Sequence, residues 1–135
     1  MKKITLSFLL IACVATVWAQ QIVSNYTIAT TLNGASFAWT QTTFDFGKIK
    51  HNEPVTNTFT FVNTGTDPLV ISSVQASCGC TVTQYSKDPI APGAKGFVKA
   101  TYNAAKVGQF TKTVTVNANT DDAVVQLTIK GEVTE

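Results

Sequence analysis

The chain of 135 residues contains no arginine, and it has only one histidine and one methionine. Charged residues make up only 13% of the composition, and every basic residue is a lysine. Domains that bind nucleic acid are usually strongly basic, and they use arginine for bidentate contacts to phosphates and base edges. A chain of this composition is therefore a poor match for a nucleic-acid partner.

The scarcity of histidine also limits the catalytic chemistry that the chain can support. His51 is the only imidazole, and it is followed by Asn52-Glu53-Pro54, a sequence typical of a turn. A cysteine nucleophile needs a base close by, and we expect His51 to be a solvated turn residue instead. The sequence has no glycine-rich phosphate loop and no nucleophile elbow. We therefore expect no catalytic residues and no cofactor.

Residues 1–19 have the features of a bacterial signal peptide. Lys2 and Lys3 form a positive region, and an uncharged apolar run follows over residues 4–17. Val17-Trp18-Ala19 fits the site that signal peptidase reads, so we expect the exported chain to begin at Gln20. The apolar run is too short for a bilayer, which takes about 20 apolar residues, and no later segment could span a membrane. Because Lys2 and Lys3 account for the whole net charge of +2, the exported domain would be neutral.

A second processing site competes with this one. Leu10-Ile11-Ala12-Cys13 resembles a lipobox, and cleavage before Cys13 would leave a lipid anchor at the new N-terminus. However, the residues after Cys13 stay apolar up to Trp18, whereas the tether of a lipoprotein is usually polar. We therefore favour export to the periplasm or cell envelope of a Gram-negative bacterium. A lipoprotein and an uncleaved helix are the alternatives.

The remainder of the chain predicts one all-β domain over residues 37–135, preceded by a leader or extra edge strand over residues 20–36. Short segments alternate polar and apolar residues with a period of two, as half-buried strands do, and turn-forming residues separate them. The first strand signals lie at 37–39 and 43–47, where Gly47 is expected to end or kink the strand. The other expected strands cover residues 56–62, 69–74, 82–85, 98–102, 110–117 and 125–133. About seven strands of this kind predict an antiparallel β-sandwich.

The alternation also predicts which side chains form the core. On three of these strands, apolar residues face one side and threonine, lysine or glutamine faces the other. We expect the following side chains to be buried: Phe59, Phe61, Val114, Val116, Leu127 and Ile129.

Several motifs, in their order and spacing, resemble the exported bacterial family known as domain of unknown function 1573. They are Phe44-Asp45-Phe46-Gly47, Phe59-Thr60-Phe61-Val62-Asn63-Thr64-Gly65, Pro68-Leu69-Val70-Ile71, Ser77-Cys78-Gly79-Cys80-Thr81, Ile90-Ala91-Pro92-Gly93, Gly108-Gln109-Phe110 and Leu127-Thr128-Ile129-Lys130-Gly131-Glu132-Val133. The resemblance covers about Phe37 to Thr134, and it implies an immunoglobulin-like sandwich similar to the Hydin-type domains of ciliary proteins. The family has no established activity, so it supplies no catalytic residues for this chain.

Cys78-Gly79-Cys80 is the one motif after the signal that carries reactive side chains. In an extended strand, residues two apart have Cα atoms about 6.6 Å apart, at the upper end of what a disulfide accepts. Gly79 could permit a kink that brings Cys78 and Cys80 closer together. Closing so small a loop restricts the unfolded chain by only about 1.6 kcal/mol. A Cys78–Cys80 bond is therefore expected to stabilise the fold only weakly. It is also expected to be easily reduced, as redox-active disulfides are.

Metal binding is the third role open to these cysteines. Two thiolates suit Cu(I) or Zn(II), but a closed structural zinc site needs four ligands. Besides Cys78 and Cys80, the exported chain offers His51, and carboxylates such as Asp45 or Glu53 could contribute only if the fold brings them close. We expect the cysteines to be structural, with redox exchange and soft-metal binding as alternatives. The overall expectation is a non-catalytic envelope module that binds an unknown protein or polymer, with a small thiol protein as the alternative.

Overall fold

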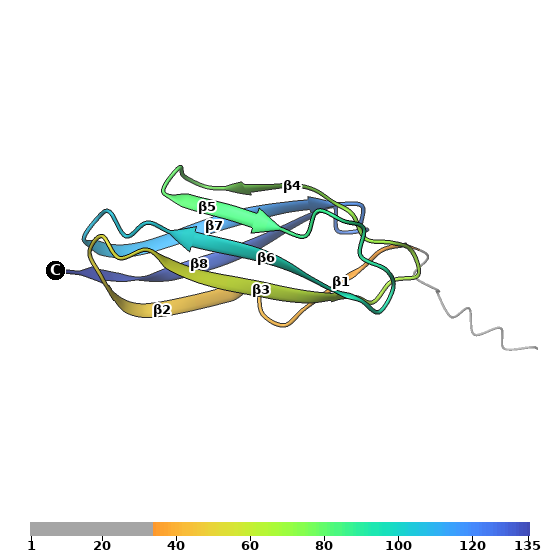
Figure 1. The fold of residues 1–135 in the computed structure, drawn as a ribbon, viewed down its shortest axis with the longest axis horizontal. Helices are drawn as coiled ribbons and strands as arrows, with labels where there is room; N and C mark the ends of the chain where they lie inside the picture. The colour runs from red at the N-terminus through yellow and green to blue at the C-terminus, as the bar shows by residue number, and fades with distance from the viewer. Residues whose placement is uncertain (1–33) are drawn as a thin grey trace, which may run out of the picture.

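The computed structural model describes residues 34–135, which form two four-stranded sheets packed face to face (Figure 1). One sheet has the strand order β1–β3–β6–β5, and the other has the order β2–β8–β7–β4. No helix in this part of the chain is long and apolar enough to cross a membrane. The strands are β1 (Phe37–Trp39), β2 (Thr43–Lys50), β3 (Val55–Asn63), β4 (Ile71–Ala76), β5 (Thr81–Tyr85), β6 (Lys95–Tyr102), β7 (Gly108–Ala118) and β8 (Val124–Thr134).

The core lies between the sheets and follows from the period-two alternation of the strands. Because successive side chains point to opposite faces, each strand turns one set inward and leaves the other in solvent. All six side chains that the sequence predicts to be buried have exposed fractions of 0 or 1%. The β-sandwich expected from the sequence is therefore confirmed, including the face that each of these strands buries.

The first edge strand is divided between the two sheets. β1 pairs with β3, and this contact ends where the amide of Thr40 donates to the carbonyl of Thr60. The chain then crosses to the other sheet, where Thr42 accepts a hydrogen bond from the amide of Thr128. As a result β2 runs parallel to β8, whereas the other strand pairs are antiparallel. The sheet switch explains why the strand signals at 37–39 and 43–47 form two separate strands, β1 and β2, in different sheets.

Gly47 kinks β2 rather than ending it. Its φ is +66°, a backbone conformation that favours glycine, and the pairing with β8 shifts register between Asp45 and Lys48. The side chain of Asp45 accepts a hydrogen bond from the Gly47 amide at 2.8 Å, which holds the backbone of this kink. The strand continues from this bulge to Lys50, so it is longer than the sequence suggested.

A buried asparagine joins three loops at one end of the sandwich. Asn63 is fully buried at the end of β3. Its side-chain oxygen accepts hydrogen bonds from the amides of Ser36 and Gly65, at 3.3 and 3.0 Å. Its side-chain nitrogen donates to the carbonyls of Asp67 and Ile90, at 2.8 and 2.9 Å. One side chain therefore holds the start of the described chain against the β3–β4 and β5–β6 loops.

Candidate functional site

The Cys78-Gly79-Cys80 sequence forms the corner where the chain passes from one sheet to the other. It connects β4 to β5, which are edge strands of the two different sheets. On the β4 side, the amide of Ser77 donates to the carbonyl of Thr113 at 2.8 Å. On the β5 side, the carbonyl of Cys80 accepts a hydrogen bond from the amide of Asn103 at 3.0 Å. Both ends of the corner are thus fixed to neighbouring strands.

The two cysteines form a disulfide in this corner. Their Cα atoms are 5.3 Å apart, which is closer than the spacing in an extended strand and within the range that disulfides accept. The turn between β4 and β5 brings them together, and Gly79 is exposed with open space around its Cα. Cys78 and Cys80 are half-buried, and Cys80 packs against the hydrophobic core. The disulfide is therefore both part of the packing and within reach of solvent.

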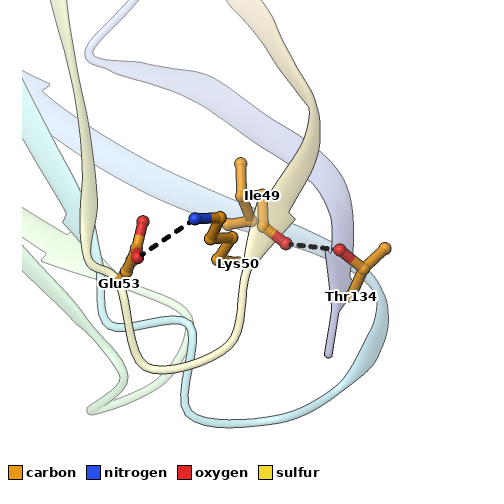
Figure 2. Close-up of polar contacts among 4 residues, drawn as sticks. All are labelled: Ile49, Lys50, Glu53 and Thr134. Atoms are coloured by element: carbon orange, nitrogen blue, oxygen red, sulfur yellow. Dashed lines mark hydrogen bonds and ion pairs between the residues drawn. The ribbon is translucent and has the colours of Figure 1, made fainter.

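His51 lies at the same end of the sandwich, in the β2–β3 turn. It is exposed, and its Nε2 lies 3.2 Å from the carbonyl oxygen of Ala105 in the β6–β7 loop. Figure 2 shows the contacts around this turn, where Lys50 Nζ lies 3.9 Å from Glu53 Oε1 and Thr134 Oγ1 donates to the Ile49 carbonyl. The prediction that His51 is a solvated turn residue is confirmed.

The structure does not gather the weak metal-ligand candidates around the cysteines. Glu53 pairs with Lys50, and Asp45 lies 4.0 Å from Lys130 on the β2–β8 surface. Within residues 34–135, no group of three or more histidine, cysteine, aspartate or glutamate side chains lies close enough to hold a metal ion. The reactive group that the corner presents in this structure is the Cys78–Cys80 disulfide.

A second feature, which sequence patterns missed, lies at the opposite end of the sandwich. A cavity of about 410 Å³ opens between the two sheets beside Trp39. Its walls come from β1, from the start of β8 and from the β7–β8 loop: Ser36, Phe37, Trp39, Thr120, Asp121, Asp122 and Val125. The only signal in the sequence was the pair of aromatic residues in β1, which alternation alone assigns to the core.

Comparison with known proteins supplies a family and a fold. The model of the family described as "Protein of unknown function (DUF1573)" matches residues 37–133. A protein of unknown function from Porphyromonas gingivalis W83 has a similar structure, with a TM-score of 0.66 and 17% identity over 80% of this chain. The match covers 51% of that protein, so the chain spans about half of its length. No curated protein matches the chain.

Two further solved structures share the architecture. The PapD-like domain 7 of human CEP192 gives a TM-score of 0.63 at 9% identity, over 76% of this chain and 87% of that one. The VesB protease of Vibrio cholerae gives a TM-score of 0.58 at 13% identity, over 73% of this chain and 32% of the protease. At these identities the likeness concerns the fold alone, because one sandwich fold hosts many unrelated functions.

Proposed function

We propose, since the chain belongs to the DUF1573 family of proteins of unknown function, that it is an exported, non-catalytic module that binds a protein or polymer of the cell envelope through its sheet edges. The observation that carries this proposal is the edge strand β5, whose outer side pairs with no other strand among the described residues. Exposed edges are usually protected by lysine, proline or a covering segment. β5 contains neither lysine nor proline, and its Val82 is 64% exposed. Such an edge suits the addition of an extended segment as a further strand.

Photo-crosslinking in the producing cells tests this function. A photoreactive residue in place of Val82 on β5 is expected to give discrete adducts with an envelope component. The matched control replaces Thr58, which is exposed in the middle of the same sheet on β3. Adducts from Val82 alone support binding at the edge. Equal labelling from both positions, or none from either, would contradict the proposal.

The proposed export and processing of the chain can be tested separately. The protein purified from its native host is expected to begin at Gln20 and to carry no lipid. Intact-mass spectrometry reports both properties in one experiment. Recovery of a chain that begins with a lipidated Cys13 would instead place the protein on a membrane surface. The segment concerned lies outside the described residues, so this expectation depends on the sequence alone.

A second candidate function is thiol–disulfide exchange at the corner, and the half-buried Cys78–Cys80 disulfide is the observation that favours it. In this reaction a dithiol partner would give two electrons and two protons to the Cys78–Cys80 bond. The products would be two thiols in this chain and a disulfide in the partner. Because the loop is short and Gly79 is exposed, a partner thiolate could reach the bond from solvent.

The double variant Cys78→Ser, Cys80→Ser separates these two roles. Because the disulfide closes a very short loop, we expect the variant to lose no more than about 2 kcal/mol in urea unfolding. If the parent catalyses no thiol exchange between glutathione and a model disulfide, the corner has a structural role. If the parent catalyses that exchange and the variant has lost it, the thiol function replaces the binding module.

A further inference from the structure

β8 is an inner strand for only part of its length. On one side it pairs with β7 from Val124 to Val133. On the other side β2 begins at Thr43, which lies opposite Thr128. Among the described residues, no strand covers this second side over residues 124–127. The inner strand therefore has an open edge four residues long.

The backbone groups at this edge are aimed outward. The amide of Thr128 donates to the carbonyl of Thr42 on the β2 side. Along a strand, the hydrogen-bonding groups of alternate residues point in the same direction. The amide and carbonyl groups of Gln126 and Val124 therefore point to the place that β2 would fill if it began earlier. They form a short ladder ready for another strand.

The Trp39 cavity opens beside this edge. Val125 of β8 lines it from one sheet, and Phe37 and Trp39 line it from the other. The rings of Phe37 and Trp39 stack, with centroids 4.9 Å apart, and they make an apolar wall. The indole Nε1 of Trp39 is buried and forms no hydrogen bond with any of residues 34–135. A buried indole N–H is normally paired, so this atom points to an acceptor that a ligand supplies.

The charge around the cavity is negative. Asp121 and Asp122 line its rim from the β7–β8 loop, and both are exposed. The two other loops at this end of the sandwich add Asp67 and Asp88. The cations at this end are Lys87 and, at the start of β6, Lys95, so the four aspartates outnumber the two lysines. Interfaces are usually complementary in charge, so a segment that binds here is expected to be basic.

We propose that this gap binds an extended, basic segment of another protein. The segment adds as a strand along residues 124–127 of β8. It places an apolar side chain in the Trp39 cavity and a lysine or arginine near Asp121 and Asp122. This site rests on the proposed binding function and names the partner class for it. A polymer without a peptide backbone could not form the strand-type hydrogen bonds that the amide and carbonyl groups of Val124 and Gln126 offer.

The fluorescence of Trp39 reports occupancy of the site, because Trp39 is the only tryptophan after the expected signal. The probe is a capped eight-residue peptide of alternating valine and lysine, and the control peptide alternates valine and glutamate. Side chains alternate in a strand, so the valines can face the cavity while the charged residues face out. We expect saturable binding of the lysine peptide and at least about tenfold weaker binding of the glutamate peptide, because like charges would then meet.

Variants of the exported chain then locate the contact. Asp121→Asn with Asp122→Asn is expected to weaken binding of the lysine peptide about tenfold, whereas Glu53→Gln, which removes an exposed carboxylate at the opposite end of the sandwich, leaves it unchanged. Gln126→Pro removes an amide donor from the open edge and is expected to abolish binding. Equal binding of the lysine and glutamate peptides would overturn the site. So would binding of the lysine peptide that persists in both the aspartate variant and the proline variant. An absence of peptide binding would overturn the site as well. Crosslinks from Val82 without peptide binding here would refute this site but leave the proposed function standing.

Discussion

Replacing Asn63 with alanine is expected to lower the free energy of unfolding by about 3–5 kcal/mol, because three backbone groups would lose a hydrogen-bond partner in a partly buried setting. The amides of Ser36 and Gly65 and the carbonyl of Asp67 bond to the Asn63 side chain. The fourth partner, the carbonyl of Ile90, keeps a second bond from the amide of Leu69. Urea unfolding of the parent and the variant measures the loss.

Asn57→Ala is the matched control for this prediction. Asn57 lies on the same strand, but its side-chain nitrogen is buried and makes no hydrogen bond with any described residue. Its removal should therefore change the unfolding free energy by less than about 1 kcal/mol, since no buried partner is left unpaired. Similar losses in the two variants would show that the Asn63 hydrogen bonds do not stabilise the loops.

Replacing Leu127 with alanine is expected to destabilise the domain by about 2–5 kcal/mol, the usual range for large-to-small changes in a core. Leu127 is fully buried on β8 between the two sheets, so the smaller side chain would leave a cavity. The neighbouring change Gln126→Ala is the control, because Gln126 is exposed on the opposite face of the same strand. It should shift stability by no more than about 0.5 kcal/mol. A loss that small for Leu127→Ala would contradict the assigned core face.

The fold could be predicted from the sequence largely because strands impose a period of two on their side chains. The alternation of Phe59 and Phe61 with threonines fixed both the strand and its buried face. The same pattern says nothing about which strand lies beside which. The crossing of the chain between Thr40 and Thr42, and with it the parallel β2–β8 pair, depends on hydrogen bonds between distant residues and could not be foreseen.

Polar residues were harder to interpret than apolar ones. Asn63 directly follows the strand expected over residues 56–62, and asparagine is common in turns, so the sequence did not indicate its burial. Its full burial and four hydrogen bonds depend on three loops that converge from different parts of the chain. The open edge of β8 was hidden for the same reason, since it results from where β2 begins rather than from any residue in β8 itself.

The candidate chemistry of the cysteines was only partly accessible from their spacing. Two residues apart, Cys78 and Cys80 could be inert, bridged or metal-bound, and spacing alone left all three open. The turn between β4 and β5 decides their geometry and brings their Cα atoms to 5.3 Å. This turn depends on the pairing of β4 and β5 with other strands, which has no local signature in the sequence around Cys-Gly-Cys.

Amide hydrogen exchange at Gln126 tests the central claim about the Trp39 cavity, that the domain binds an extended segment along the open edge of β8. In the free protein, Gln126 is expected to exchange quickly, because its amide faces the gap, whereas Leu127 exchanges slowly through its pairing with β7. Adding the valine–lysine peptide should protect Gln126 and leave Leu127 unchanged. An amide of Gln126 that is already protected without the peptide, or that stays unprotected when the peptide is saturating, would contradict the claim.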